Sequence, residues 1–426
     1  MGRGERLRRL DKDLVGHERI QHNGGLGIVV LSIEPMRPEA AIQWSLPPSK
    51  SHMIRWLALA AQAEDETTLS FSGSVGEDVR SMAGCLRQLG IGIEERDSSW
   101  IVRGVSRNEF SVPEGVLDCG NSATTARFLM AMAAGMSEPI ILDGDRSLRR
   151  RNMSVLAGVL RDLGCEVTSD RLPLTVTGPI ASGHARLDLS DSSQPLSALL
   201  IASPNYSGVI SLETSSHRVS KGYSELSYEL TAKCGSSNEM LYDGLTLEPW
   251  PHDTPREVEI PVELSLLPIA MLLAELHSVE VVVMGGNLEL SVAMRELAEW
   301  AEVLDLRDES DIIAPAAALM ALGGGGRITG VAHARGKESD RIRSTVSLLR
   351  CFGMEASESE DGVEVAGGQV PLRPELPVDS MEDHRLAMTA MALASKCGGI
   401  VNGSEVCKVS DPGFIDRLMA IGGGDV

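Results

Sequence analysis

Six segments of the chain share one pattern, in which a short polar cluster precedes a helix-length run rich in Ala, Leu and Met. They lie at 46–62, 120–135, 191–203, 262–276, 310–326 and 382–399. Each run is apolar on nearly every side, which is typical of a helix buried among other elements. The segments recur roughly every 50–70 residues, too far apart for a solenoid and well suited to a small α/β unit. The pattern therefore predicts six copies of one α/β unit.

Between these segments the hydrophobic pattern changes to that of strands and shorter helices. We expect an edge strand at 28–33 and a second strand at 40–46. A strand with a turn, a helix that ends at glycine, and a hairpin are predicted in turn at 67–78, 78–90 and 93–105. The same rhythm of a helix and a strand pair returns at 154–177, 224–248 and 344–365.

Length and composition set the outer bounds. With 426 residues, 43% of them hydrophobic, the chain is long enough for two domains of about 200 residues with substantial cores. It has no apolar run of about 18 residues and its first residues are charged, so we expect neither a membrane span nor a signal peptide. Seven cysteines without paired metal-ligand spacing fit a reduced, cytoplasmic protein.

The charge balance argues against one class of partner. Lys and Arg number 39 against 60 Asp and Glu, which gives a net charge of −21. Nucleic-acid binders need a broad basic face to meet the phosphate backbone, so we expect no nucleic-acid partner. Small anions are not excluded, because a cleft can concentrate positive charge while the outer surface stays acidic.

The polar clusters before the helices contain candidates for such an anion site. Ser49, Lys50 and Ser51 crowd the start of the first helix, and Arg55 follows one turn later. Ser is a favoured N-cap, and the unpaired N–H groups of a helix start attract anions. The alternative is a capped surface helix that carries two solvated cations.

Basic residues gather at later points as well. Arg127 follows a Gly-Asn-Ser turn, four arginines fall within 146–151, and four cations surround Glu338 and Asp340 within 334–343. Basic runs usually lie on a solvated face of the protein. The Gly-Asn-Ser stretch before Arg127 is equally explained by a turn with a helix cap. In an acidic protein, a phosphate or carboxylate ligand explains them better. Glu338 either forms ion pairs with the arginines or transfers a proton. The favoured interpretation of His384 is a core histidine that caps a helix.

Seven stretches in a fixed order carry a resemblance to a known family. They are LPPSKSHMIR, DCGNSATTARFL, GDRSLRRRNM, DSSQPLSALL, VSKGYSEL, RGKESDRIR and EDHRLAM, spread from about residue 40 to the C-terminal region. Together they resemble the EPSP synthase (3-phosphoshikimate 1-carboxyvinyltransferase) family of enolpyruvyl transferases. The parts KESDR and SKSHMIR are individually specific, and their order strengthens the resemblance.

The resemblance implies an α/β (α+β) fold, a two-domain inside-out α/β barrel in which each domain holds three βαβαββ-like repeats with buried parallel helices. One domain is discontinuous, 38–47 plus 261–426, on the phosphoenolpyruvate side with the catalytic Asp and Glu. Residues 48–260 form the other, on the shikimate 3-phosphate side. Residues 1–37 are then a partly disordered N-terminal extension, and the active site is expected in the interdomain cleft.

The implied reaction moves the enolpyruvyl group of phosphoenolpyruvate to the 5-hydroxyl of shikimate 3-phosphate and releases phosphate. The residues carried over for shikimate 3-phosphate are Lys50, Ser51, Arg55, Ser192, Ser193, Gln194, Ser220, Tyr223, Asp311 and Lys337. Those for phosphoenolpyruvate are Lys50, Ala123, Arg151, Gln194, Arg341 and Arg385. By the same resemblance, Asp311 takes the hydroxyl proton, Glu338 protonates the methylene carbon and Lys50 stabilises the leaving phosphate. No metal or other cofactor is implied, and we expect a monomer.

Some positions depart from the family pattern. They are Ala123, Asn152, Pro195, Val409 and Asp411. Ala123 stands where Gly is usual, and its methyl group is expected to weaken phosphoenolpyruvate binding and to exclude the bulkier mimic glyphosate. Val409 stands where many members carry a substrate-binding Lys. Lys408 is adjacent, but in a strand it would point to the opposite face.

Two other functions stay open at the level of sequence. A sibling enolpyruvyl transferase that acts on a UDP-sugar would share the fold, although the DSSQ, KESDR and DHR stretches speak against it. A non-catalytic relative would bind a phosphorylated ligand as a sensor or assembly component. It is disfavoured because a pure binding module has little need of Glu338 beside the retained cations.

Overall fold

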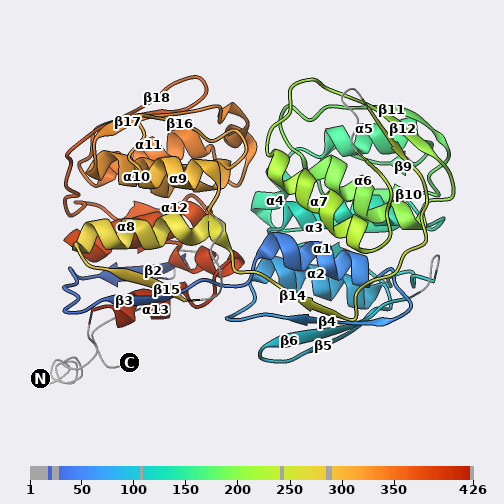
Figure 1. Cartoon of the computed structure of the whole chain (residues 1–426), viewed down its shortest axis with the longest axis horizontal. Helices are drawn as coiled ribbons and strands as arrows, with labels where there is room; N and C mark the ends of the chain where they lie inside the picture. Colours follow the sequence, from blue (N-terminus) through green and yellow to red (C-terminus); the bar gives the residue numbers. More distant parts are fainter. Residues whose placement is uncertain (1–17, 22–27, 106–108, 240–243, 285–289, 423–426) are drawn as a thin grey trace, which may run out of the picture.

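The computed structural model describes residues 18–21, 28–105, 109–239, 244–284 and 290–422. The chain forms two lobes that lie side by side (Figure 1). The central lobe runs from helix α1 (Lys50–Ala60) to strand β14 (Glu257–Glu259), and the terminal lobe holds the elements on both sides of that stretch. The buried hydrophobic side chains fall into two clusters, one in each lobe. The domain boundaries given above stay predictions.

Each lobe has three sheets among the described residues. The central lobe has the orders β14-β4-β6-β5, β7-β8-β10-β9 and β11-β12-β13, with β4 (Glu66–Ser70), β5 (Gly92–Glu95), β6 (Ser99–Arg103), β7 (Leu117–Asp118), β8 (Ile140–Asp143), β9 (Glu166–Val167), β10 (Leu174–Thr177), β11 (Gly183–Leu187), β12 (Ile210–Thr214) and β13 (Gly244–Leu247). The terminal lobe has β1-β2-β21-β20, β15-β3 and β16-β17-β19-β18, with β1 (Glu18–Gln21), β2 (Ile28–Ile33), β3 (Ile42–Ser45), β15 (Val281–Met284), β16 (Val303–Asp305), β17 (Gly325–Thr329), β18 (Ala356–Glu358), β19 (Val363–Ala366), β20 (Val378–Asp379) and β21 (Gly399–Asn402). Every one of these sheets contains one parallel strand pair, as expected when a single α/β unit is repeated.

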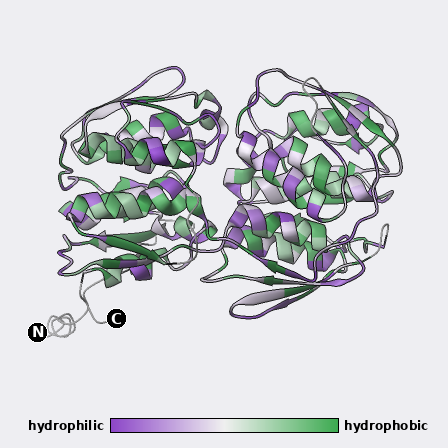
Figure 2. Cartoon of the chain, viewed as in Figure 1, coloured by the Kyte–Doolittle hydropathy of each residue, from purple (hydrophilic) through white to green (hydrophobic). Residues whose placement is uncertain are grey.

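The six predicted apolar helices are present and buried. They are α1, α3 (Ala123–Ala133), α6 (Gln194–Ala202), α8 (Leu267–His277), α10 (Ile313–Leu322) and α12 (His384–Cys397). They lie in the interior of the lobes with the sheets toward the outside (Figure 1), and Figure 2 shows their predominantly hydrophobic character. In α10 every residue from Ile313 to Ala321 is buried. The pattern of polar starts and apolar bodies therefore located each helix.

Seven further α-helices are found among the described residues. They are α2 (Glu77–Gln88), α4 (Arg146–Arg150), α5 (Ser154–Asp162), α7 (Lys221–Lys233), α9 (Val292–Ala298), α11 (Arg341–Cys351) and α13 (Phe414–Ala420). The predicted helix at 78–90 is α2, and the hairpin at 93–105 is the β5–β6 pair. The strand predicted at 28–33 is β2, but its assignment to a sheet edge was wrong. Strand β1 pairs with it on one side and β21 on the other, so β2 lies inside its sheet.

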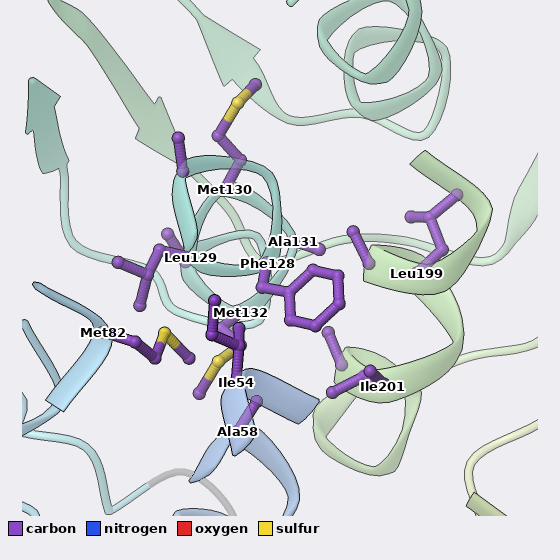
Figure 3. Packing of buried hydrophobic residues seen from close by; sticks show 14 of the residues in the cluster. Ile54, Ala58, Met82, Phe128, Leu129, Met130, Ala131, Met132, Leu199 and Ile201 are labelled. Atoms are coloured by element: carbon purple, nitrogen blue, oxygen red, sulfur yellow. The ribbon is translucent and has the colours of Figure 1, made fainter. Parts of the chain in front are cut away.

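Tight helix packing holds the central lobe together. Phe128 of α3 packs between α1 and α6, near Ile54, Ala58, Leu199 and Ile201 (Figure 3). Alanine-rich surfaces let these helices approach closely, and dense packing makes their relative positions rigid. Because the helices are rigid, the polar residues at their N-terminal ends are held in fixed positions.

The chain passes between the lobes at two segments that pair with each other. The N–H of Ser49 donates to the carbonyl of Pro261 at 2.8 Å, and the N–H of Glu263 donates to the carbonyl of Pro47 at 2.8 Å. Pro48 and Val262 form an antiparallel bridge between these two bonds. We call residues 47–49 and 261–263 the crossing segments, since they join the two lobes beside the start of α1.

Two further observations concern the described residues alone. None of their helices has both the length and the apolar character needed to cross a bilayer. No three His, Cys, Asp or Glu side chains among them are grouped as metal ligands would be. The cysteines, all of which lie in this part of the chain, are free thiols.

Candidate active site between the lobes

A cavity of about 380 Å³ lies between the two lobes. The first turns of α1, α3 and α6 line it from the central lobe, and the starts of α11 and α12 line it from the terminal lobe. All of the predicted site residues line this one cavity, namely Lys50, Ser51, Arg55, Ala123, Arg151, Ser192, Ser193, Gln194, Ser220, Tyr223, Asp311, Lys337, Glu338, Arg341 and Arg385. The fold brings them together, while their individual roles stay predictions.

Lys50 is held as a cation by a buried carboxylate. Its Nζ donates to Asp78 at 2.9 Å. Burial lowers the pKa of Lys50, but the charges of Asp78 and Glu338 outweigh burial and raise this pKa above its ordinary value. Burial also raises the pKa of Asp78 despite the Lys50 charge, and one Asp78 oxygen has no hydrogen-bond partner among the described residues. Sequence reasoning missed Asp78, because an acid in a first helical turn is common for its favourable interaction with the helix dipole.

Asp311 lies at the centre of three donors. Its carboxylate accepts hydrogen bonds from Tyr223 Oη at 2.7 Å, Lys337 Nζ at 2.8 Å and Arg341 Nη1 at 2.5 Å. Burial pushes the pKa of Asp311 upward, but Lys337 and Arg341 outweigh it and hold this pKa well below its usual range. Since Tyr223 belongs to the central lobe, this carboxylate also joins the two lobes.

Glu338 lies between two arginines. It accepts hydrogen bonds from Arg341 Nη2 at 2.7 Å and from Arg151 Nη1 at 3.4 Å across the cleft. Burial favours the protonated form, but the two guanidinium groups outweigh it, so the pKa of Glu338 lies well below its ordinary value. Without ligand, therefore, Glu338 is an ionised carboxylate whose charge balances arginines.

Arg341 is the most heavily paired cation of the cavity. Besides Asp311 and Glu338 it donates through Nε to Asp383 at 2.9 Å. These three carboxylates hold its pKa well above the ordinary value although burial opposes them. Asp383 is fully buried and also accepts the N–H of Arg385 at 2.9 Å, which caps α12. The same carboxylate thus fixes a helix start and a side chain of the cavity.

Arg127 orients the amide of Gln194. Its Nη1 donates to Gln194 Oε1, and its Nη2 donates to the carbonyl of Asn152 at 3.0 Å. The neighbouring Arg151 donates to Asn121 at 2.6 Å, while its buried Nε has no partner among the described residues. An unpaired buried N–H is costly, which makes Arg151 a strong candidate to receive an anion.

Arg55 is more deeply integrated in the protein than the sequence indicated. It donates to Ser227 Oγ at 2.9 Å, to the Ser51 carbonyl at 2.9 Å and to the Tyr223 carbonyl at 3.0 Å. Its guanidinium also lies 5.5 Å from the ring centroid of Phe128. Burial lowers its pKa to about 10. Arg55 therefore reaches the cavity while most of its donors already serve the fold.

The hydroxyl side chains of the cavity differ in their bonding. Ser192 Oγ accepts the N–H of Gln194 at 3.2 Å, whereas the buried Oγ of Ser193 has no partner among the described residues. Ser220 precedes α7 in a left-handed conformation with φ of 55°, and its N–H donates to the Arg307 carbonyl of the other lobe at 3.0 Å. The Ser193 hydroxyl is thus left for a ligand to hydrogen-bond.

Two histidines of the cavity are neutral in this environment. His384 Nε2 accepts from Arg385 Nε at 3.2 Å, and burial together with Lys50 holds the pKa of His384 well below its ordinary value. His333, which sequence reasoning missed, lies 2.9 Å through Nε2 from Ser310 Oγ, and burial lowers its pKa to about 4. A single histidine in a short 3-10 helix gives no sequence signal that separates it from a surface residue.

The expected cap of α1 was wrong. Ser49 precedes α1, but its hydroxyl makes no capping bond to the helix backbone. Instead it donates to Glu263 at 3.3 Å, and the N–H of Lys50 donates to the same carboxylate at 3.0 Å. An acidic side chain from the other crossing segment therefore occupies this helix start.

The departures from the family pattern divide into two groups. Ala123, Asn152 and Pro195 line the cavity, whereas Val409 and Asp411 do not. The residues around Val409 form a 3-10 helix (Ser404–Val409), so the alternation of side chains along a strand does not apply to Lys408. Asp411 is buried and forms an ion pair with Arg417 of α13, so its contact in this structure is with the fold and not with the cavity.

Comparison with solved structures identifies the fold. The solved structure of EPSP synthase from Acinetobacter baumannii covers 92% of this chain and 98% of its own length, with a TM-score of 0.73 at 21% identity. The enolpyruvyl transferase NikO from Streptomyces tendae shares the fold with a TM-score of 0.68 at 13% identity, covering 92% of this chain and 97% of its own. The architecture is that of the enolpyruvyl transferases, and the predicted two-domain inside-out α/β fold is confirmed.

Sequence comparison narrows this class to one family. The family model for EPSP synthase (3-phosphoshikimate 1-carboxyvinyltransferase) matches residues 39–231 and 264–418. A protein of Methanocorpusculum labreanum named 3-phosphoshikimate 1-carboxyvinyltransferase is 31% identical, covering 88% of this chain and 95% of its own. A protein of the same name from Thermococcus kodakarensis is 30% identical, covering 91% and 99%. The chain belongs to the EPSP synthase family.

Proposed function

We propose that this chain transfers the enolpyruvyl group of phosphoenolpyruvate to the 5-hydroxyl of shikimate 3-phosphate, forming 5-enolpyruvylshikimate 3-phosphate and phosphate. This is a step of the shikimate pathway to aromatic amino acids. The observation that carries the proposal is that Lys50, Arg151, Arg341 and Arg385 meet two partly buried carboxylates, Asp311 and Glu338, in one cavity of a chain of this family. Both proposed substrates carry several negative charges, which such a cluster of cations is suited to neutralise.

Shikimate 3-phosphate is assigned mainly to the central lobe. The proposed contacts are Lys50, Ser51, Arg55, Ser192, Ser193, Gln194, Ser220 and Tyr223, with Asp311 and Lys337 from the terminal lobe. The unpartnered hydroxyl of Ser193 and the remaining donor capacity of Arg55 support this half of the site. Lys337 and Arg341 keep Asp311 ionised, so its carboxylate is available to receive a hydroxyl proton once substrate anions compete for these cations.

Phosphoenolpyruvate is assigned to the space between the two lobes. The proposed contacts are Lys50, Arg151, Gln194, Arg341 and Arg385, together with the backbone at Ala123. The unpaired Nε of Arg151 supports this assignment, since a phosphate or carboxylate oxygen would satisfy it. Ala123 is the first residue of α3, so its N–H belongs to the four that a helix leaves without an intrahelical acceptor.

The proposed chemistry is an addition followed by an elimination. The 5-hydroxyl oxygen bonds to the carbon that bears the phosphate, Asp311 accepts the hydroxyl proton, and Glu338 gives a proton to the methylene carbon. Phosphate then leaves with the help of Lys50, and the methyl carbon returns a proton to the Glu338 carboxylate, which restores the double bond. The cations supply the charge stabilisation, and no metal is proposed.

Substrate binding would change the state of Glu338. Arg151 and Arg341 hold the pKa of Glu338 well below its usual range in the protein alone. A substrate phosphate or carboxylate that binds these two arginines competes for the same donors and adds negative charge nearby. Both effects raise the pKa of Glu338, so it is able to carry a proton when phosphoenolpyruvate is present.

A phosphate-release assay tests the proposed reaction against its alternatives. The purified chain is given phosphoenolpyruvate with either shikimate 3-phosphate or a UDP-sugar acceptor. Turnover with shikimate 3-phosphate alone supports the proposal, and turnover with the UDP-sugar alone overturns it in favour of the sibling activity. Absence of phosphate release with both acceptors would identify a non-catalytic relative. The shared fold of NikO does not select the acceptor, so the assay must.

Three further expectations belong to this proposal. The protein is a monomer, which gel filtration tests directly. It acts in the cytoplasm, in keeping with seven free cysteines, five of them buried. Residues 48–260 and 38–47 plus 261–426 are its two domains, with phosphoenolpyruvate handled mainly by the second.

A further inference from the structure

Glu263 lies in the crossing segment and bonds to the start of α1. One of its carboxylate oxygens accepts the N–H of Lys50 at 3.0 Å and the hydroxyl of Ser49 at 3.3 Å. Its backbone N–H is fixed by Pro47 at 2.8 Å. Glu263 is 7% exposed and does not line the cavity. Its charge is therefore directed at the positive end of a helix and not at a ligand.

The second oxygen of Glu263 leads to the other side of the cavity. It accepts the hydroxyl of Ser265 at 2.5 Å. Ser265 Oγ in turn accepts from Arg385 Nη2 at 2.7 Å, and the Ser265 carbonyl accepts from Arg385 Nη1 at 2.9 Å. Both terminal nitrogens of Arg385 are thus held by one neutral residue, which is itself oriented by Glu263.

Arg385 differs in this respect from the other buried arginine of the terminal lobe. Arg341 forms ion pairs with three carboxylates, whereas Arg385 forms none with any described residue. The Ser265 hydroxyl lies between the Arg385 guanidinium and the Glu263 carboxylate. Ser265 therefore orients the Arg385 guanidinium, and no carboxylate of the described residues pairs with it. Its positive charge is available to an incoming anion.

We propose that Glu263, at the end of a crossing segment, and Ser265, two residues later, form a positioning relay that orients both Lys50 and Arg385. The inference rests on the proposed function, in which these two cations bind phosphoenolpyruvate. Neither relay residue touches substrate. Glu263 fixes the backbone that carries Lys50, and Ser265 fixes the plane of the Arg385 guanidinium. Because the crossing segments join the lobes, the relay ties the phosphoenolpyruvate site to the place where the lobes meet.

The relay predicts a substrate-selective defect. In Ser265→Ala the Arg385 guanidinium loses the hydroxyl but keeps the carbonyl, so its orientation loosens. Loss of one hydrogen bond to a charged group raises the KM for phosphoenolpyruvate about ten-fold or more. The KM for shikimate 3-phosphate, which Arg385 is not proposed to contact, changes less than about two-fold. Ser265→Thr keeps the hydroxyl and restores most of the affinity for phosphoenolpyruvate.

The control is Ser395→Ala, the same substitution at the far end of the helix that carries Arg385. Ser395 is buried and bonds to His277 and to the Ala392 carbonyl, so its loss lowers Tm without acting on the cavity. Glu263→Gln is the third variant. Its amide has only one acceptor oxygen, so it cannot accept from both the Lys50 N–H and the Ser265 hydroxyl, and the KM for phosphoenolpyruvate rises. In the double variant with Ser265→Ala, the rise in this KM is smaller than the product of the two single effects.

The outcome of steady-state kinetics and thermal melting is decisive. If wild type does not turn over phosphoenolpyruvate with shikimate 3-phosphate, the proposed function fails together with the relay that rests on it. If wild type is active but Ser265→Ala leaves the KM for phosphoenolpyruvate unchanged, or raises both KM values equally, only the relay is overturned. Fully multiplicative effects in the double variant overturn it as well.

Discussion

Lys50 and Arg385 are two cavity cations that reach their charged state by different routes. Lys50 has a direct carboxylate partner in Asp78, whose charge raises the pKa of the ammonium against the effect of burial. Arg385 has only hydroxyl, carbonyl and imidazole acceptors among the described residues. A guanidinium stays protonated without help, whereas a buried ammonium does not. At the residue scale, therefore, Asp78 matters for protonation and Ser265 for orientation.

The effect of Asp78 appears in the pH dependence. In Asp78→Asn the Lys50 ammonium loses its nearest negative charge, burial then dominates, and the pKa of Lys50 falls. Activity requires the protonated ammonium, so the alkaline limb of the kcat profile moves to lower pH. A full pH–rate profile measures the shift. Glu77→Gln, one residue earlier at an exposed position, is the control and keeps the wild-type limb. An unshifted limb in Asp78→Asn would contradict the prediction.

Ala123 gives a prediction on inhibitor selectivity. Its methyl group is at the first position of α3 and lines the cavity, where the family usually has glycine. Ala123→Gly removes it, so the KM for phosphoenolpyruvate should fall and glyphosate should inhibit at lower concentration. Inhibition curves for both proteins measure this.

The matched control is Ala126→Gly. Ala126 lies in the same helix but faces the core, where glycine costs helix stability without enlarging the cavity. This variant should lower Tm and keep the inhibition curve of the wild type. Ordinary glyphosate sensitivity in the wild-type protein would refute the idea that Ala123 excludes this inhibitor.

At the scale of elements, the helix starts of the terminal lobe are held by carboxylates of different burial. Asp383 caps α12 and accepts from Arg341 and Ser339 while fully buried. Asp340 caps α11 through the N–H of Arg343 but is partly exposed. Both are N-caps by sequence, yet only one also compensates a buried charge.

This difference predicts unequal costs of the same substitution. Asp383→Ala removes a cap and one partner of buried Arg341, and we expect a loss of about 3 kcal/mol in the free energy of unfolding. Asp340→Ala removes a cap near solvent and should cost about 1 kcal/mol. Urea unfolding of both variants measures the two losses, and equal losses would show that burial of the carboxylate is immaterial.

The elements also mark where sequence reasoning succeeds and where it stops. Helix α10 is predictable because its run of apolar residues is a local signal that burial requires. The partner of Ser49 is not, because Glu263 lies 214 positions later and meets it only where the crossing segments pair. Motifs placed Lys50 in a site, but Asp78 belongs to no motif and became visible only through its contact with Lys50.

At the scale of the whole molecule, charge is distributed unevenly. The chain carries a net charge of −21, yet the cavity gathers cations from both lobes. Two adjacent arginines bridge the lobes, Arg150 to Glu382 and Arg151 to Glu338. The side chains of the first pair are 51% and 49% exposed, and those of the second pair are 7% and 14% exposed. Solvent screening therefore weakens one bridge much more than the other.

The two bridges give a prediction that separates lobe contact from catalysis. Arg150→Ala removes an exposed ion pair. Its Tm should stay within about one degree of the wild-type value, and its kcat/KM within about two-fold. Arg151→Ala removes a buried guanidinium proposed to bind phosphoenolpyruvate, so kcat/KM for this substrate should fall about 100-fold or more. The variants differ by one position and remove the same group. Comparable losses in both would mean that bridging between the lobes, and not anion binding in the cavity, limits activity.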